Sequence, residues 1–414
     1  MKKLIISLAK KNHFFMVLLR KTRFLIGRLR YIFYYLTNKV DDNLIVFDAY
    51  MGRQYACSPK AIYEELKNNK KYKNFKFVWA FKNPDEYKHL KGKKTDLVRY
   101  GSKQYYKLMS QAKYWITNSR LNEFILKKKN QVYIQCWHGT PLKKLGYDIT
   151  VSGGNAMNSV KDIRYKYKSD SKRYDYMISP SKFCTEKFAS AFDIKNKDIL
   201  IETGYPRNDF LINFKKTDVD KIKKELNIPK KKKVILYAPT WRDDQHSAGV
   251  GYTYQPSIDF DELKKQFGTE YVLLFRTHYF IANYIDLDKY NGFVYNVSQY
   301  DDINDLYVIS DILITDYSSV FFDYANLKRP MIFYMYDYDA YKNKLRDFYI
   351  DLEELPGPIV RTEKELNEAI KNIDKKKYAK EYKKFNKKYN YLDDGKCAKR
   401  VIDIILKEEI CEKI

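Results

Sequence analysis

Several common signatures are missing from this chain of 414 residues. No Gly-x-Gly-x-x-Gly follows a predicted strand and no Gly-x-x-x-x-Gly-Lys-Ser/Thr occurs, which argues against dinucleotide binding and a Walker ATPase. There is no Gly-x-Ser-x-Gly nucleophile elbow. The five cysteines are scattered, with no Cys-x-x-Cys pair and no histidine at metal-ligand spacing. We therefore expect reduced structural thiols in a cytosolic protein and no structural zinc.

Acidic residues and long apolar runs are both missing from residues 1–39. This segment has ten Lys and Arg residues, no acid before Asp41, and only short apolar groups at 4–9, 14–19, 24–26 and 31–36. None approaches the ~20 apolar residues of a spanning helix, and no cleavage pattern predicts a signal peptide. Interleaved basic and apolar residues favour a helix lying in a membrane interface. A basic helix packed on the next domain, or a nucleic-acid arm, is the alternative.

Positive charge dominates the whole chain. Lys and Arg number 78 against 52 Asp and Glu, a net charge of +26. This balance favours an anionic partner, such as nucleic acid, an acidic membrane or a phosphorylated substrate. The 40 Tyr and 24 Phe residues could stack on bases, but a Lys- and Tyr-rich compositional bias is the explanation that we favour.

From residue 43 onward, short apolar segments alternate with helical ones, which predicts parallel sheets covered on both faces. The strongly charged stretch 215–233 marks the connection between two domains. The fold class expected is therefore α/β, with two Rossmann-like doubly wound domains that hold ligands at the carboxyl ends of their sheets. The predicted strands are 44–47, 75–80, 114–117, 132–137, 176–178 and 199–203, then 234–238, 271–275, 293–295, 312–315, 331–334 and 359–360.

Two polar motifs follow strands of the first predicted domain. In CWHGTP, residues 136–141, His138 lies in a turn as a candidate general base, Gly139 allows close approach of a ligand, and Thr140 can cap a following helix. The alternative is a histidine bonded within its own turn. In GYPRND, residues 204–209, Arg207 could grip phosphate and Asp209 could orient Arg207 or His138. The alternative there is a turn with an Asp cap.

Three more motifs follow strands of the second predicted domain. YAPTWR, residues 237–242, offers Thr240 and Arg242, or is simply a capped helix start. In FRTH, residues 275–278, Arg276 and His278 share one side of an extended chain and could face a dianionic leaving group, or form a structural pair. TDYSS, residues 315–319, predicts a phosphate-holding turn at a helix start, or an ordinary cap. Its candidate binding residues are Asp316, Ser318 and Ser319.

Little in the sequence indicates a cofactor. The triplets at 286–288 and 337–339 alternate Asp with another residue, and such triplets can hold a metal on a nucleotide diphosphate. They also arise easily by chance, so we assign no metal ligand and expect no cofactor, without excluding a divalent metal.

Together the motifs HGTP, GYPRND, APTWR, RTH and TDYSS, in this order, resemble the CDP-glycerol glycerophosphotransferase family of Gram-positive teichoic-acid synthesis. The resemblance implies a GT-B arrangement of the two domains. It implies transfer of glycerol phosphate or ribitol phosphate from CDP-glycerol or CDP-ribitol to a lipid-linked (undecaprenyl diphosphate) acceptor, with release of CMP. The implied place is the cytoplasmic face of the cell membrane, with peripheral attachment and no nucleic acid.

The resemblance also assigns roles to residues and segments. It implies that His138 and His278 are essential, and that Arg276, Ser318 and Ser319 hold the diphosphate or the transferred phosphate. The expected segments are a membrane-contacting part at 1–42, an acceptor-side domain at 43–215, a CDP-polyol domain at 216–380 and C-terminal helices at 381–414. One departure is Tyr279, where the family often has Pro after the RTH-type motif. A sugar transferase using a nucleotide sugar, or a non-catalytic RNA- or membrane-binding protein, remains the alternative.

Overall fold

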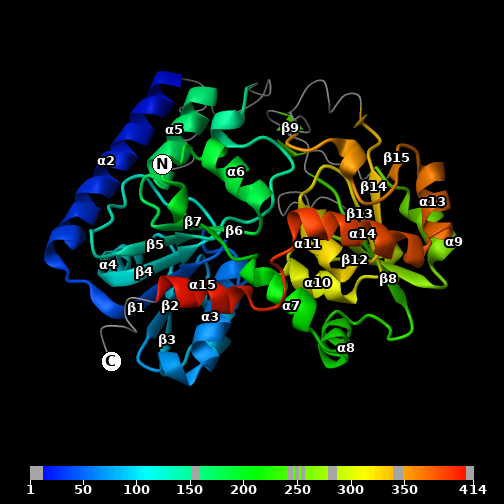
Figure 1. The fold of residues 1–414 in the computed structure, drawn as a ribbon, viewed down its shortest axis with the longest axis horizontal. Coiled ribbons are helices and arrows are strands. Elements are labelled where there is room, and N and C mark those ends of the chain that lie inside the picture. Colours follow the sequence, from blue (N-terminus) through cyan, green and yellow to red (C-terminus); the bar gives the residue numbers. More distant parts are fainter. Residues whose placement is uncertain are drawn as a thin grey trace.

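The structure is a computed structural model that describes residues 13–150, 159–240, 246–247, 251–252, 257–277, 287–338 and 348–406. Two α/β domains lie side by side, each built on one parallel sheet (Figure 1). Candidate residues His278 and Arg242, and the acidic residues at 286 and 339, fall outside the described residues.

The first sheet has seven strands in the order β3-β2-β1-β4-β5-β6-β7. Buried residues alternate between its faces, so that Val46 and Val78 face one hydrophobic core while Ile45 and Phe77 face the other. Burial on both faces explains why these strands read as apolar runs. The strands are β1 (Asp41–Asp48), β2 (Lys76–Phe81), β3 (Thr95–Arg99), β4 (Ala112–Thr117), β5 (Val132–Gln135), β6 (Tyr176–Ser179) and β7 (Leu200–Glu202).

The second sheet has six strands in the order β12-β11-β8-β13-β14-β15, all paired in parallel. Its central strands β13 and β14 are buried at every position. The strands are β8 (Lys233–Ala238), β11 (Tyr271–Phe275), β12 (Val294–Asn296), β13 (Ile312–Thr315), β14 (Met331–Tyr334) and β15 (Ile359–Val360). A separate antiparallel pair joins β9 (His246–Ser247) and β10 (Gly251–Tyr252).

Every strand predicted from the sequence is present, and the predicted α/β class with two doubly wound domains is confirmed. The prediction missed β3, an edge strand whose TDLVR sequence is half polar because much of it faces solvent. Thr362 and Glu365 form a capping box that opens α13 (Glu363–Lys371). The other helices of at least eight residues are α2 (His13–Thr37), α3 (Cys57–Asn68), α4 (Lys103–Gln111), α5 (Val160–Ser171), α6 (Lys182–Ala191), α8 (Lys216–Glu225), α9 (Phe260–Phe267), α14 (Lys375–Tyr389) and α15 (Cys397–Ile405).

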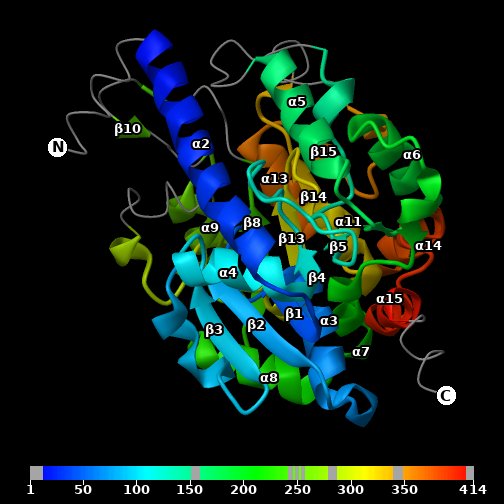
Figure 2. The same ribbon diagram turned by 90° about the vertical axis from the view of Figure 1, so that its left-hand side faces the viewer.

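The described part of the basic segment forms one long helix, α2 (His13–Thr37), which lies along the outer side of the first domain (Figures 1 and 2). It packs there through Tyr31, which is 1% exposed and meets Tyr106 edge to face. Gly27 lets the helix approach closely, since a Cβ at this position would lie 3.0 Å from the Phe124 ring. None of the described helices is both long enough and apolar enough to cross a membrane.

The last two helices belong to different domains. Helix α14 is rich in lysine, but its Tyr382 and Phe385 are buried in the core of the second domain, so only one side of the helix is solvated. Helix α15 returns to the first domain, where Val401 and Ile402 pack into the core that contains Ile62 of α3 (Figure 1). The chain therefore crosses between the domains twice, once after β7 and once between α14 and α15.

The GYPRND motif forms the first crossing and holds the second one. Gly204 has a φ of 77°, and a Cβ there would lie 2.5 Å from Cys397 Sγ, so the close passage of α15 requires glycine. The backbone N–H of Tyr205 donates to Asp393 at 2.9 Å. The carboxylate of Asp209 accepts the N–H groups of Cys397 and Ala398, both at 2.8 Å, and so caps α15.

Arg207 joins the two domains through a buried ion pair. Its Nε and Nη2 donate to the two carboxylate oxygens of Asp323, at 3.1 and 3.0 Å, in helix α11 (Val320–Tyr324) of the second domain. The guanidinium stacks on Tyr205 with 3.8 Å from its carbon to the ring centroid. Asn208 donates to Asp323 and Asp393 at 3.0 and 2.7 Å. The fork is thus occupied by a carboxylate of the protein itself.

We predict that Asp323→Ala lowers the free energy of unfolding by about 3–5 kcal/mol, because Arg207 would be left buried and unpaired. Asp261→Ala is the matched control: Asp261 pairs with Lys289, but both side chains are more than half exposed, so its loss should cost at most ~1 kcal/mol. Denaturant unfolding of both variants makes the comparison. Equal losses would show that the Arg207 pair does not hold the domains.

Candidate active site

His138 occupies a strained turn immediately after β5. Trp137, the residue before it, has a φ of 46°, in the left-handed region that non-glycine residues rarely adopt. The Trp137 ring is buried against Phe192 at 4.8 Å between centroids, and the His138 ring lies on it at 4.2 Å. Such strain persists where the surrounding packing enforces it, and is typical of functional sites.

One hydrogen bond sets the chemistry of His138. Its Nδ1 lies 2.9 Å from the carbonyl oxygen of Asn118, at the end of β4. In the neutral ring Nδ1 donates to that carbonyl, which leaves Nε2 with a lone pair to accept a proton. Part of the His138 side chain is exposed to solvent. The protein packed around the ring still desolvates it, and this lowers the pKa of His138 to about 4. The positive charges of Arg207 and Arg120 lower it further.

Motifs from the two domains touch at Gly139. A Cβ at this position would lie 2.8 Å from Ser319 Oγ of the second domain, so the Ser319 hydroxyl would have to move to make room for a larger residue. The structure thus brings His138, Gly139 and Ser319 together across the domain boundary. The sequence predicts a helix after Thr140, and this prediction is wrong: no helix begins there. Residues 141–145 instead pair with the second domain, where the N–H of Tyr349 donates to the Leu142 carbonyl at 2.8 Å.

The TDYSS turn is built around Asp316. One oxygen of its carboxylate accepts the N–H groups of Thr240 and Tyr317, at 2.8 and 2.6 Å, and so ties the end of β8 to the end of β13. Ser319 does not cap α11 with its side chain. Among the described residues, neither the Ser318 nor the Ser319 hydroxyl forms a hydrogen bond, and both are partly exposed. Asp316 is therefore a backbone anchor, and the two serines are available to a ligand.

Arg276 lies farther along the same edge, after β11. Its Nη1 donates to the carbonyl oxygens of Val297 and Tyr300, at 2.8 and 2.7 Å. Burial lowers the pKa of Arg276 from its ordinary value. The side chain lines an interdomain cavity of about 570 Å³ together with Tyr50, whose ring lies 6.1 Å from that of His138.

Three of the predicted site residues have structural roles instead. Arg207 is committed to Asp323, as described above, and is not aimed at an open phosphate site. Asp209 contacts neither Arg207 nor His138 through a described hydrogen bond, because both its oxygens cap α15. Thr140 is buried beside Tyr205 and Cys184, away from solvent. These three residues therefore hold the structure around the site and do not face a ligand.

Sequence reasoning missed Asn118, which organises two elements of the site. Its backbone carbonyl holds His138, and its side-chain oxygen accepts the N–H of Tyr50 at 2.7 Å. The available signal was its position: Asn118 is a polar residue directly after the apolar strand β4, as the motif residues are after theirs. It is fully buried, so its orientation is fixed by the fold.

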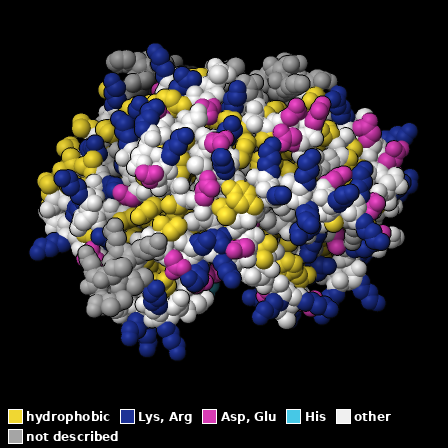
Figure 3. Space-filling view, in the orientation of Figure 1, with side chains coloured by type: hydrophobic (Ala, Val, Ile, Leu, Met, Phe, Trp, Pro, Cys, Tyr) yellow, Lys and Arg dark blue, Asp and Glu magenta, His cyan; other side chains and the backbone are white. Residues whose placement is uncertain are grey.

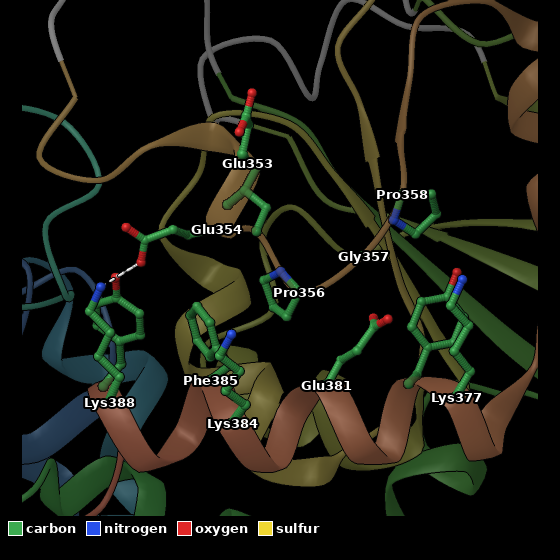
Figure 4. Close-up of a pocket in the computed structure, with 13 residues that line it drawn as sticks. Glu353, Glu354, Pro356, Gly357, Pro358, Lys377, Glu381, Lys384, Phe385 and Lys388 are labelled. Carbon is green, nitrogen blue, oxygen red and sulfur yellow. Dashed lines mark hydrogen bonds and ion pairs between the residues drawn. The ribbon is translucent and has the colours of Figure 1, made fainter.

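A second hollow lies on the outer side of the second domain. It has a volume of about 680 Å³ and lies between α14 and the loop 353–358 (Figure 4). Lys388 reaches across it to Glu354, with which it forms an ion pair. No motif residue lines it, so we do not assign the chemistry to it. Among the described residues no group of three or more His, Cys, Asp or Glu is placed to hold a metal.

The arrangement defines a two-domain α/β protein of the GT-B-like class, with polar motifs at facing sheet edges. A sequence-family profile described as CDP-Glycerol:Poly(glycerophosphate) glycerophosphotransferase matches residues 30–407. The chain belongs to this family, as its motifs predicted.

Relatives and solved structures agree with this assignment. The chain is 43% identical over 385 residues to a teichoic acid poly(glycerol phosphate) polymerase of Staphylococcus epidermidis, with 91% of this chain and 52% of that protein aligned. It is 41% identical over 375 residues to a teichoic acid glycerol-phosphate transferase of Staphylococcus aureus, with 88% and 93% aligned. It thus spans about half the length of the first relative and most of the second.

The solved structure of the wall teichoic acid polymerase TagF superposes with a TM-score of 0.85 at 39% identity, covering 97% of this chain and 98% of that one. A Staphylococcus aureus MnaA–UDP structure superposes with a TM-score of 0.52 at 13% identity, and shares the fold alone.

We predict that Gly139→Ala lowers turnover by roughly 100-fold, since a displacement of about 1 Å can have this effect. The added methyl group would push Ser319 away from the His138 turn. Gly92→Ala is the control, because a Cβ there meets nothing within 4 Å. Steady-state assays on both variants, with thermal unfolding to verify folding, decide the matter. Full activity in Gly139→Ala would mean that the contact has no role.

Proposed function

We propose that this chain transfers a polyol phosphate from a CDP-polyol to a hydroxyl of a lipid-linked acceptor and releases CMP. The carrying observation is that no described residue bonds Nε2 of His138 and that the next residue, Gly139, contacts Ser319 of the opposite domain, in a chain of the glycerophosphotransferase family. Relatives named for glycerol phosphate reach 43% identity. One named for ribitol phosphate reaches 36% over 67% of the chain. We therefore favour CDP-glycerol over CDP-ribitol as the donor.

In the proposed reaction the acceptor hydroxyl attacks the phosphorus that carries the polyol. The new bond joins the acceptor oxygen to that phosphorus, and the bond from phosphorus to the CMP oxygen breaks. His138 Nε2 takes the hydroxyl proton. The hydroxyls of Ser318 and Ser319 donate to phosphate oxygens, and His278 stabilises the charge that grows on CMP. Positioning and electrostatics supply most of the acceleration of such phosphoryl transfers.

We predict that His138→Ala lowers turnover at least 100-fold, in line with the ~10²–10⁴ that a general base contributes. Because the neutral ring is the active form and its pKa is about 4, kcat/KM should stay level from pH 8 to pH 6. It should fall only as the pH approaches 4. A pH–rate profile of the wild-type protein tests this. A fall centred near the ordinary histidine pKa of about 6.5 would show that the fold does not lower this pKa, and near-normal turnover of a folded His138→Ala protein would remove the general-base assignment.

Ser318→Ala with Ser319→Ala should weaken CDP-glycerol binding, by ~1.5–3 kcal/mol for each hydrogen bond lost to a charged phosphate. Ser169→Ala is a suitable control, because its hydroxyl donates to the carbonyl of Lys166 within α5. Calorimetric titration with CDP-glycerol gives the affinities. An unchanged affinity in the double variant would remove both serines from the donor site.

We further propose that α2 holds the protein on the cytoplasmic face of the membrane, where the acceptor lipid lies. One stripe of this helix faces solvent, and hydrophobic side chains gather over it at the edge of the molecule (Figure 3). The hydrophobic residues of this stripe follow one another at intervals of seven, four, four and three positions, so they stay on one face of the helix over about 27 Å. Helical periodicity puts basic residues along both borders. The stripe contains Leu18, Leu25, Leu29, Phe33 and Leu36, which are 49–74% exposed.

The basic residues and the apolar stripe of α2 together suit binding at a membrane interface. Each Lys or Arg near an anionic surface adds about 1 kcal/mol of attraction, which salt partly screens. The apolar side chains then supply the affinity that persists at high salt. The opposite face of α2 is already occupied by the first domain through Tyr31, so the helix can lie flat on a membrane without leaving the protein.

We predict that Leu29→Glu with Phe33→Glu abolishes co-sedimentation with anionic vesicles at high salt, while CDP-glycerol binding persists. Deleting residues 1–39 should have the same effect. Ile212→Glu is the control, since Ile212 is 41% exposed on the connection between the domains. If the α2 variants sediment like the wild type, the membrane contact lies elsewhere, with the Lys-rich face of α14 as the first place to look.

A further inference from the structure

Arg120 lies beside His138 at the carboxyl edge of the first sheet, although it belongs to none of the sequence motifs. Thr117 at the end of β4 pairs with Gln135 at the end of β5. Arg120 and His138 each follow their strand end by three residues, and neighbouring strands lie about 4.8 Å apart. Burial is the main cause of the lowered pKa of His138, and the positive charge of Arg120 adds to it. The two side chains therefore share one region of the site.

A rigid aromatic surface holds the Arg120 side chain. Its guanidinium carbon lies 4.6 Å from the centroid of the Tyr167 ring, in helix α5. Tyr167 is 8% exposed and contacts the Trp137 ring at 5.9 Å between centroids and the Phe192 ring at 4.8 Å. A Cβ at Gly146 would lie 2.5 Å from the Tyr167 ring, so the backbone also packs closely against this ring. Contact with a ring face holds a guanidinium in place without using its N–H donors, so Arg120 can present them to a ligand.

No described residue forms a hydrogen bond or an ion pair with Arg120, which is partly exposed. The carboxylate of Asp170 lies in its vicinity: burial raises the pKa of Asp170, and the charge of Arg120 opposes this rise. That carboxylate is already bonded, because Arg173 forms an ion pair with it and the hydroxyl of Tyr174 donates to it at 2.7 Å. Arg207, whose charge also lowers the pKa of His138, is committed to the ion pair between the domains. Arg120 is thus an available cation next to the proposed base.

In-line geometry decides which substrate this cation meets. In a phosphoryl transfer the attacking oxygen and the departing oxygen lie roughly in line, on opposite sides of the phosphorus. His138 must contact the attacking hydroxyl, so Arg120 beside it lies on the acceptor's side of the transferred group. The hydroxyls assigned to the donor phosphate, those of Ser318 and Ser319, come from the second domain. An acceptor that already ends in a polyol phosphate carries a phosphate a few bonds from the hydroxyl that attacks.

We infer that the guanidinium of Arg120 binds the phosphate of the acceptor's terminal polyol-phosphate unit, and so brings the hydroxyl of that unit to His138. The fork of an arginine matches two oxygens of one phosphate, which a point charge does not. Arg120 thereby selects acceptors that end in a polyol phosphate over those that do not. This inference rests on the proposed function and deepens it, because it names the group of the acceptor that the first domain recognises.

Kinetics with a lipid-linked acceptor that ends in glycerol phosphate test the inference. Arg120→Gln should raise the KM for this acceptor about tenfold or more, as expected for a lost bond to a charged group. The kcat and the KM for CDP-glycerol should change little. Arg120→Lys should recover part of the loss, because lysine keeps the charge but not the fork.

Arg99→Gln is the matched control. Arg99 is exposed and ends β3, which β2 and β1 separate from β4, so this variant removes the same charge from the same sheet edge at a distance. Thermal unfolding verifies that each variant folds. An unchanged acceptor KM in Arg120→Gln, a rise in the KM for CDP-glycerol instead, or the same effect in Arg99→Gln would overturn the inference.

A binding measurement that needs no turnover separates the inference from the proposed function. The probe is diglycerol phosphate, a phosphodiester of two glycerols, observed by NMR during titration with the full chain. Arg120→Gln should weaken its binding about tenfold or more, whereas Arg99→Gln should not. Equal binding by Arg120→Gln and by the wild-type protein would overturn the inference. A wild-type protein that binds the probe through Arg120 but uses no CDP-polyol would refute the proposed function and leave the phosphate site at Arg120 in place.

Discussion

A guanidinium and a carboxylate, both removed from water, meet between the two sheets. Arg207 comes from the turn after β7 and Asp323 from the helix after β13. Desolvating such a pair is costly, and the cost is offset only by good geometry and by bonds to the remaining polar atoms. The forked contact, the stack on Tyr205 and the amide of Asn208 meet that requirement. Separation of the domains would expose or orphan all of these groups together.

The candidate active site depends on this joint because it is assembled from both sides. His138 is oriented from the first domain by Asn118, and the adjacent Gly139 is contacted by Ser319 from the turn that leads into the helix of Asp323. The strained backbone at Tyr50 and Trp137 surrounds the same region. The fold thus places its costly local conformations where the two edges face each other.

Apolar runs made most of the fold readable from the sequence. The strands of the second sheet are buried on both faces, so their boundaries were predicted closely. The half-polar edge strand β3 lacked this signal. Local patterns also placed His138 and the serines in turns after strands. They could not reveal what Arg207 and Asp209 contact, because their partners are Asp323 and Cys397, 116 and 188 residues farther along the chain.

Local sequence patterns do not reveal contacts between distant segments, which also explains why a helix was wrongly predicted after Thr140 and why the interdomain cavity was not predicted. Residues after Thr140 bond to Tyr349, and only the assembled domains bring the two segments together. Lys82 and Arg53 belong to no motif, since surface lysines and arginines are abundant in a chain of this charge. Their position in one cavity with Arg276 is a property of the domain arrangement and not of any local sequence.

The return of α15 to the first domain has a mechanical consequence. The two connecting segments run side by side and are fastened to each other through Asp393 and Asp209. Two chains fixed together at one place allow rotation about a single line and resist sliding or twisting. Any opening of the molecule is therefore a hinge rotation about the two connecting segments, and the domains separate most at the edge farthest from Gly204.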